Sequence, residues 1–171
     1  MEIKIRTHYD RDALTAMARG LRRTVRRKRS RITRVLGVCI ALLGISLGLG
    51  ELLLNPPEIG WPSLLAGLVV TAVLLTEDRV NGRLARSKML PGTAESVTRF
   101  GPEGYETTTQ AGTMAWKYEN ILAIAEGKRY FVFALSQRHA QAYDKQGFLQ
   151  GTPEELRTLL RDKTGLPVTK M

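Results

Sequence analysis

The segment "LRRTVRRKRSRITRVLGVCIALLG", from Leu21 to Gly44, changes from strongly basic to apolar within a few residues. Eight Lys or Arg residues lie between Arg22 and Arg34, and no further charged side chain follows until Glu51. A dense positive cluster directly before an apolar run is typical of a membrane-spanning helix and its cytoplasmic flank. This segment therefore predicts a membrane protein.

The charge of the chain is concentrated at this end. The 171 residues carry a net charge of +10, yet residues 1–34 hold twelve Lys or Arg against three acidic residues. Residues 35–76 contain only Glu51 and Glu58 as charged residues. A nucleic-acid-binding domain carries its basic residues as a patch on the domain itself. The uneven distribution therefore favours membrane lipids over nucleic acid as the partner of the basic segment.

Two apolar stretches, residues 35–54 and 62–89, are predicted transmembrane helices, the second with a cytoplasmic extension. A bilayer core about 30 Å thick needs ~20 helical residues. The prolines in the short external loop at 55–61 end the first helix. Two alternatives are less favoured: a cleaved signal peptide has a much shorter basic start, and a buried hairpin of a soluble protein shows a polar face, which "SLLAGLVVTAVLLT" lacks.

Basic residues flank the two stretches on their outer sides only. Arg79, Arg83, Arg86 and Lys88 follow the apolar part of the second stretch, in its cytoplasmic extension, and the loop between the stretches contains no Lys or Arg. The positive-inside rule then places both termini in the cytoplasm, with the hairpin in the cell (inner) membrane.

Residues 10–34 are predicted to form a basic amphipathic helix. Leu14, Met17, Leu21 and Val25 recur at helical spacing, and arginines cover the other faces. Such a helix beside a membrane span lies along the headgroups or continues the span. The residues expected to contact anionic lipid are Arg22, Arg23, Arg26, Arg27, Lys28 and Arg29.

Small residues line one face of each predicted span. They are Gly37, Ala41, Gly44 and Gly48 on the first, and Ser63, Gly67 and Thr71 on the second. Small residues let helix backbones approach closely in lipid. We expect these residues to pack the hairpin against itself, with dimerisation as the less favoured alternative.

Residues 91–171 are predicted to form a separate β-rich domain. Six short strands between 94 and 144 alternate with turns, and a helix at 153–164 begins with the capping box Thr152-Pro153-Glu154-Glu155. Antiparallel strands closed by a C-terminal helix outline a pleckstrin-homology-like (PH-like) domain. In residues 1–9, Ile3 and Ile5 alternate with polar residues, which predicts a strand that joins this sheet. The predicted fold class is an α+β membrane protein with a transmembrane hairpin and a cytoplasmic PH-like domain.

The segments "TRFGPEGYE", "AWKYENILAIAEGKRYFVFAL" and "AYDKQGF" resemble the YcxB-like family of bacterial membrane proteins. The shared features are Trp116 and Ile121 ahead of Glu126, the aromatic pair Tyr130-Phe131, and Lys145 with Phe148. The resemblance spans nearly the whole chain. It implies two transmembrane helices and a membrane-anchored cytoplasmic module with a PH-like C-terminal domain, and it supplies no catalytic residues.

The sequence contains no pattern that indicates an enzyme. It has no phosphate-binding glycine loop, no paired cysteines and no HExxH or GxSxG motif, and Cys39 is the one cysteine. We therefore expect no catalytic residue, no cofactor and no metal. The predicted function is a membrane-anchored, non-catalytic interaction module that binds an unknown protein or its own copy; the alternative is a lipid-surface binder or sensor acting through the polybasic helix.

Overall fold

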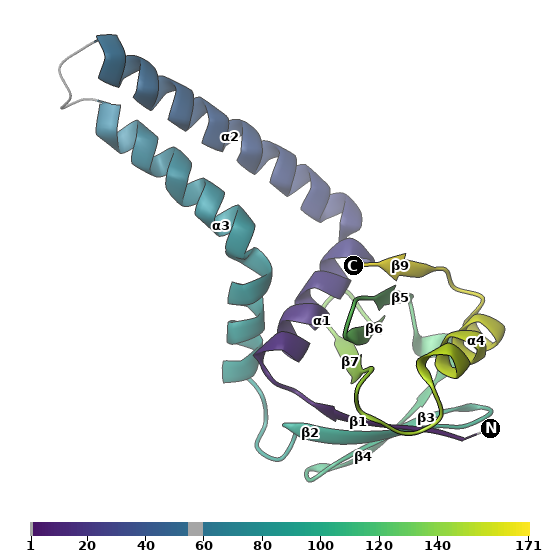
Figure 1. The fold of residues 1–171 in the computed structure, drawn as a ribbon. Coiled ribbons are helices and arrows are strands. Elements are labelled where there is room, and N and C mark those ends of the chain that lie inside the picture. Colours follow the sequence, from purple (N-terminus) through teal and green to yellow (C-terminus); the bar gives the residue numbers. More distant parts are fainter. Residues whose placement is uncertain (1, 55–59) are drawn as a thin grey trace. The chain divides into compact units, whose positions relative to one another are not determined.

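The computed structural model describes residues 2–54 and 60–171 of this α+β protein, which combines two long apolar helices with two sheets (Figure 1). In chain order the elements are β1 (Ile3–His8), α1 (Arg11–Arg23), α2 (Arg27–Leu54), α3 (Gly60–Ser87), β2 (Glu95–Phe100), β3 (Gly104–Thr109), β4 (Gly112–Lys117), the 3-10 helix η1 (Tyr118–Asn120), β5 (Ala123–Glu126), β6 (Tyr130–Ala134), β7 (Ala140–Asp144), β8 (Phe148–Gln150), α4 (Pro153–Thr164) and β9 (Val168–Lys170).

The described residues form two compact units. The first, here the β-domain, combines residues up to 27 with residues 78–171, so it contains β1, α1, the last part of α3 and everything that follows. The second, here the helical hairpin, comprises residues 28–77 without the undescribed 55–59.

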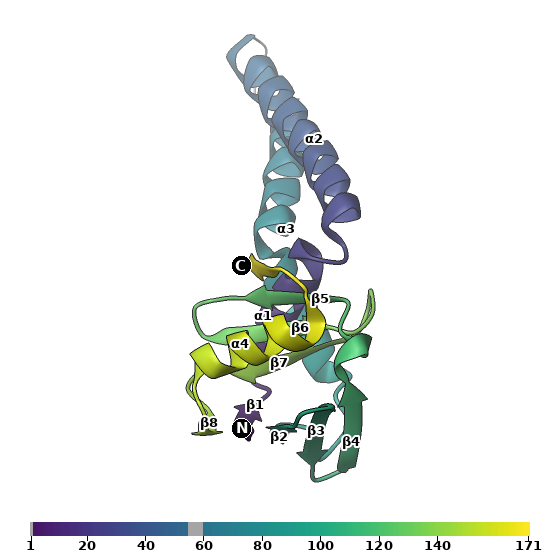
Figure 2. The same ribbon diagram turned by 90° about the vertical axis from the view of Figure 1, so that its right-hand side faces the viewer.

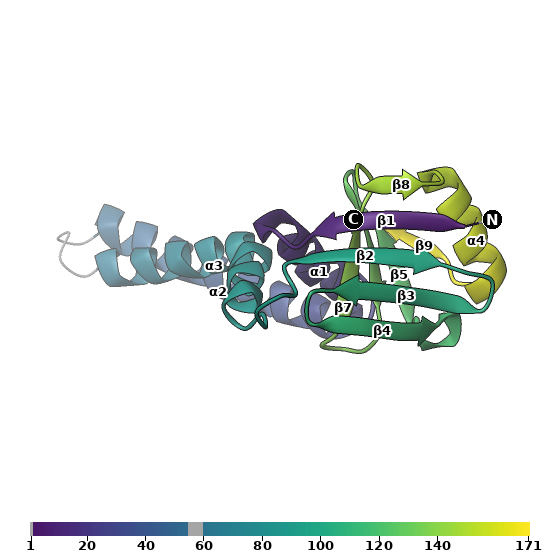
Figure 3. The same ribbon diagram turned by 90° about the horizontal axis from the view of Figure 1, so that it is seen from below.

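Two sheets make up the β-domain. One has the strand order β4-β3-β2-β1-β8, and Figure 3 shows its strands side by side. The other has the order β7-β6-β5-β9, in which only β9 runs parallel to its neighbour β5. Six of these strands, β2 to β7, lie within about two residues of the six predicted between 94 and 144. Strands β8 and β9, of three residues each, were not predicted.

The N-terminal strand β1 lies inside the first sheet, between β2 and β8. It pairs antiparallel with β2, so that Ile3 faces Phe100 and Ile5 faces Thr98. The side chains of Ile3, Ile5 and Thr7 are buried, as expected for alternate residues of a strand with one face on a core. The pairing predicted for this segment is present, although both long helices separate it from β2 in sequence.

Strand β6 is buried on both faces because it lies between two apolar layers. Phe131 and Phe133 belong to the core between the two sheets, where the Phe133 ring contacts those of Phe100 and Tyr143. Val132 and its neighbours on the opposite face pack against α1. The β-domain is therefore layered as sheet, core, sheet and helix α1 (Figure 2).

Helix α4 confirms the predicted helix at 153–164 residue for residue. The Thr152 hydroxyl accepts a hydrogen bond from the Glu155 amide, and the Glu155 carboxylate accepts one from the Thr152 amide. This reciprocal pair satisfies two amides that the first helical turn leaves free. Leu156 and Leu160, one turn apart, are fully buried in the core between the sheets.

The two helices of the hairpin are long and apolar enough to cross a membrane by length and composition. Only 11% of the apolar window of each helix is buried, whereas a core helix of a soluble protein is mostly buried. Helix α2 ends at Leu54 as predicted, and α3 begins and ends two residues before the predicted 62–89. Most of the loop predicted at 55–61 lies outside the described residues.

The basic segment 10–34 is not one helix, contrary to prediction. Helix α1 ends at Arg23, and α2 begins at Arg27. At Thr24 the backbone leaves the helical conformation, and its hydroxyl donates to the Gly20 carbonyl. Val25 still packs against the apolar cluster beneath α1, while the Arg26 amide donates to the Leu21 carbonyl and the Arg27 amide to the Thr24 carbonyl, outside the regular helical pattern. The arginines are therefore divided between α1 and the first turns of α2.

Candidate functional site

The small residues of the hairpin lie where α2 and α3 approach each other. A methyl group on Gly48 would lie 2.5 Å from the Leu64 amide nitrogen, and one on Gly67 would lie 2.8 Å from the Ala41 carbonyl oxygen. The contacts at Gly44 and Gly37 are less close: a methyl group on Gly44 would lie 3.0 Å from the Ser63 carbonyl oxygen, and one on Gly37 would lie 3.0 Å from the Leu74 side chain. Thr71 donates its hydroxyl to the Gly67 carbonyl within its own helix. Among the seven predicted residues, the glycines therefore make the close contacts between α2 and α3.

The six basic residues predicted to contact lipid have different surroundings. Arg22 is largely buried and pairs with Asp78 of α3. Arg23 donates to the Lys170 carbonyl and Arg26 to the Gln137 carbonyl, both within the β-domain. Arg27, Lys28 and Arg29 are exposed on the first turn of α2. Arg22 therefore has a structural role, and the exposed residues stay candidates for lipid contact.

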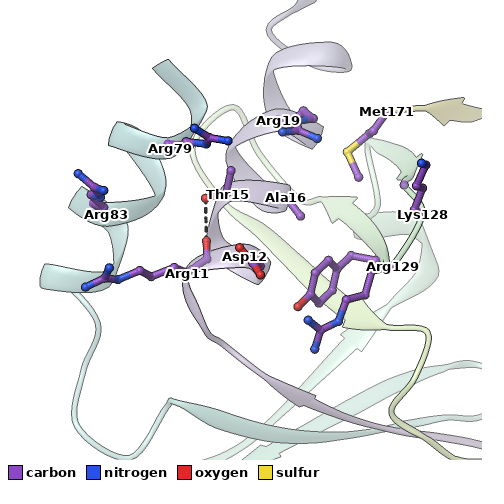
Figure 4. Close-up of a pocket in the computed structure, with 12 residues that line it drawn as sticks. Arg11, Asp12, Thr15, Ala16, Arg19, Arg79, Arg83, Lys128, Arg129 and Met171 are labelled. Carbon is purple, nitrogen blue, oxygen red and sulfur yellow. Dashed lines mark hydrogen bonds between the residues drawn. The ribbon is translucent and has the colours of Figure 1, made fainter. Parts of the chain in front are cut away.

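A basic pocket of about 550 Å³ lies in the β-domain between α1, the end of α3 and the turn that joins β5 to β6 (Figure 4). Tyr130 and Ala16 contribute apolar surface to it. Six basic residues line the pocket: Arg11 and Arg19 from α1, Arg79 and Arg83 from α3, and Lys128 and Arg129 from the turn. Asp12 is the one acidic residue among the lining residues.

Two of the six cations have carboxylate partners. Arg129 donates to Asp144 at 2.8 and 3.1 Å, and Arg19 lies 3.5 Å from Asp78. Arg11, Arg79, Arg83 and Lys128 form no ion pair with any residue in the described ranges 2–54 and 60–171. The pocket therefore has a surplus of positive charge.

Tyr130 lines the basic pocket as a neutral side chain. Burial raises the pKa of Tyr130, and the nearby Asp10 carboxylate raises it further. The Arg129 guanidinium lies 5.0 Å above the Tyr130 ring, and its hydrogen bond to Asp144 raises the pKa of Arg129. Arg129 is consequently a fixed, permanently charged donor at the rim.

A second hollow, of about 730 Å³, lies beside the turn between β2 and β3. Its charges balance, because Arg99 and Lys117 line it together with Glu103 and Glu106. Arg99 in addition pairs with Glu2 at 2.6 Å. This balanced charge does not favour the binding of an anion, and the turn between β2 and β3 itself carries the acidic Glu103.

Glu126, one of the residues that carry the family resemblance, is the centre of an ion-pair network. Its carboxylate accepts hydrogen bonds from Lys145 at 2.5 Å and from Arg157 of α4 at 2.7 Å. Partial burial alone would raise the pKa of Glu126, but the hydrogen bonds from Arg157 and Lys145 outweigh it, so the pKa is lowered. Both cations also lie over the ring of Phe131. The network ties β5 and α4 to Lys145, the residue directly after β7.

No family model, curated protein or solved structure matches this chain.

The basic pocket was not predicted as a unit. Its residues come from three segments, at 11–19, 79–83 and 127–130, whose association depends on the tertiary fold. One local signal was present: Arg79 and Arg83 are four residues apart and therefore share a helix face, with Gly82 between them.

Proposed function

We propose that the protein is a membrane-anchored, non-catalytic module of the YcxB-like type. In this proposal α2 and α3 cross the bacterial inner membrane as a hairpin, and the β-domain lies on the cytoplasmic side as a PH-like interaction domain. The observation that supports it most directly is the exposure of two 28-residue apolar helices. Apolar side chains in such numbers are stable in water only when covered, and lipid covers them.

The proposed orientation rests on where the positive charges lie along the chain. Arg27, Lys28, Arg29, Arg31 and Arg34 occupy the first turns of α2, and Arg79, Arg83 and Arg86 occupy the end of α3. Between Arg34 and Arg79 the sequence has no Lys or Arg. Positive flanks on the two outer ends favour cytoplasmic termini.

The PH-like assignment is supported by the element order of the β-domain. Antiparallel strands in two packed sheets are followed by α4, whose Leu156 and Leu160 close the core between the sheets. The absence of a catalytic constellation in the sequence favours binding over catalysis, with a protein or a second copy of this chain as the partner.

Cysteine labelling of intact cells tests the proposal. In a Cys39→Ala background, a cysteine replacing Glu58 is expected to react with a membrane-impermeant thiol reagent on intact cells. A cysteine replacing Glu154 is expected to react only after lysis. Labelling of both positions before lysis, or of Glu154→Cys alone, would reject the proposed topology, and recovery of the protein in the soluble fraction would reject the membrane anchor.

A lipid-surface binder or sensor is the second candidate, and the exposure of Arg27, Lys28 and Arg29 favours it. Each such residue near an anionic leaflet contributes about 1 kcal/mol of attraction. Purification in neutral detergent, with identification of what remains bound, separates the candidates. A stoichiometric protein partner supports the interaction module, whereas retained anionic lipid that is lost in the Arg27→Gln/Lys28→Gln/Arg29→Gln variant supports the lipid-surface binder.

A further inference from the structure

The basic pocket of the β-domain is built from parts that hold each other in place. On one side, α3 approaches α1 so closely that a methyl group on Gly82 would lie 2.7 Å from the Thr15 hydroxyl oxygen and 2.9 Å from the Thr15 amide nitrogen. Thr15 is itself fixed, because its hydroxyl donates to the Arg11 carbonyl at 2.7 Å (Figure 4). The glycine thus sets the separation between the arginines of α3 and those of α1.

The α3 side of the basic pocket is anchored a second time, next to its arginines. Asp78, which directly precedes Arg79, is nearly buried and accepts hydrogen bonds at 2.7 and 2.6 Å from Arg22 of α1. Arg79 and Arg83 follow on neighbouring turns of the same helix. Their backbone positions are therefore fixed relative to α1.

The opposite side is a short turn whose ends are tied. The Gly127 amide donates to the Tyr130 carbonyl at 2.8 Å, which closes the turn that carries Lys128 and Arg129. The two hydrogen bonds from Arg129 to Asp144 fix the direction of its guanidinium. Basic groups consequently line the pocket from three separate elements.

The charge of this arrangement fits a phosphate group. Arg11, Arg79, Arg83 and Lys128 carry four positive charges without ion-pair partners in the described part of the chain, and Asp12 offsets one of them. Like charges gathered in one hollow repel each other, and a bound anion removes that repulsion. A phosphomonoester carries a charge of about −1.5 to −2 near neutral pH and offers three acceptor oxygens. Arginine forks match such oxygens with paired hydrogen bonds.

We propose that the basic pocket is a binding site for a phosphate-bearing anion, with Arg79 and Arg83 as its principal ligands and Arg11 and Lys128 completing the charge. The volume of about 550 Å³ lies within the ~300–1,000 Å³ range of ligand pockets, so it holds a phosphate together with the group that carries it. The phosphate belongs either to a lipid headgroup or to a soluble phosphate compound. Binding of a lipid headgroup rests on the proposed membrane anchor, whereas binding of a soluble phosphate compound does not.

The test uses full-length protein in neutral-detergent micelles and two probes. Calorimetric titration with inorganic pyrophosphate represents the soluble source. Native mass spectrometry of micelles that contain phosphatidic acid, compared with phosphatidylcholine, represents the headgroup. The wild-type protein is expected to bind at least one anionic probe saturably. The Arg79→Gln/Arg83→Gln variant is expected to bind it about 10- to 100-fold more weakly, since each charge-assisted contact contributes roughly a factor of ten.

A matched control removes two positive charges from the same unit but outside the pocket. Arg138→Gln/Lys163→Gln changes two exposed residues and is expected to keep the wild-type affinity. Circular dichroism checks that both double variants fold. Saturation by pyrophosphate supports a soluble phosphate compound, and saturation by phosphatidic acid alone supports a headgroup. The proposal is wrong if neither probe binds the wild-type protein saturably, if Arg79→Gln/Arg83→Gln retains the affinity, or if the control loses as much.

Discussion

Asp78 and Arg22 join two helices across 56 residues of sequence through a pair of hydrogen bonds, at 2.7 and 2.6 Å. The side chains are only 12% and 15% exposed. The fork of Arg22 meets both oxygens of the carboxylate, which is the strongest geometry for such a pair. This contact fixes the end of α3 to α1 within the β-domain.

The first prediction concerns the stability of this pair. Removing one partner leaves the other charge largely buried, so Asp78→Asn and Arg22→Gln are each expected to lower the free energy of unfolding of the β-domain by about 2–4 kcal/mol. Trp116 fluorescence during urea unfolding, in a Trp61→Phe background, measures the change. Arg23→Gln, one residue away and exposed, is the control. Equal effects of Arg22→Gln and Arg23→Gln would contradict the structural role of the pair.

The second prediction concerns strand β1. Ile3→Asp and Ile5→Asp each place a charge in the core between the sheets and remove ~1.5–3 kcal/mol of apolar burial. We expect faster proteolysis of the β-domain in the full-length protein. Arg6→Gln, on the exposed face of the same strand, loses only its ion pair with Glu95 and is expected to be cleaved at the wild-type rate. Unchanged proteolysis in both aspartate variants would mean that β1 is dispensable for the sheet.

The third prediction concerns pH. Because the pKa of Glu126 is lowered in the folded state, its network stabilises the β-domain fully above the ordinary value of 4.5. This stabilisation is lost as the pH falls through the lowered pKa. Glu126→Gln is expected to cost about 2–3 kcal/mol at pH 7 and to flatten the decline of stability below pH 4.5. Urea unfolding at a series of pH values measures both effects.

A control for Glu126 exists in the same network. Glu154 is exposed, and its carboxylate accepts a hydrogen bond from Arg157 at 2.7 Å without packing in the core. Glu154→Gln is expected to change the acid profile very little. A Glu126→Gln profile that runs parallel to the wild-type profile would show that other carboxylates govern acid unfolding.

The fourth prediction concerns the packing of the hairpin. Gly48→Leu forces its side chain into the backbone of Leu64, so it is expected to separate α2 from α3. Gly50→Leu is the matched control because a methyl group there meets nothing within 4 Å. The midpoint of unfolding in sodium dodecyl sulfate, followed in Trp61 fluorescence in a Trp116→Phe background, should fall for the first variant only. A similar fall for both would indicate that helix propensity or bulk, rather than this contact, decides the result.

The fifth prediction concerns Asp12, the acidic residue that lines the basic pocket. Asp12→Asn is expected to bind the anionic probe several-fold more tightly, because a like-charged neighbour is removed. The same change is expected to cost ~0.3–1 kcal/mol of stability, since Asp12 complements the dipole at the start of α1. Calorimetric titration and thermal unfolding measure the two effects, and weaker binding by this variant would argue against electrostatic recognition in the pocket.

Elements with a strong local pattern were predictable. The alternation of Ile3 and Ile5 indicated a strand with one buried face, and the capping box at Thr152 fixed the start of α4. The end of α1 was not predictable, because Arg22 to Arg34 continue a helical composition and no proline or glycine marks the break at Thr24. Strands of three residues, such as β9, have no period to detect. The basic pocket was not predictable, because Arg79 and Arg83 of α3 fit the positive-inside rule equally well and their neighbours in the pocket come from distant segments.

The position of β1 in the middle of its sheet has a consequence for biosynthesis. The ribosome completes β1 and α1 before either long helix, whereas the strands on both sides of β1, β2 and β8, emerge only after both helices are finished. During synthesis, β1 therefore has no neighbouring strand to pair with until β2 has emerged, and its second neighbour, β8, follows later still. A fragment that starts after α3 would lack the strand between β2 and β8, so a soluble version of the β-domain requires residues 2–27 to be joined directly to residues 78–171.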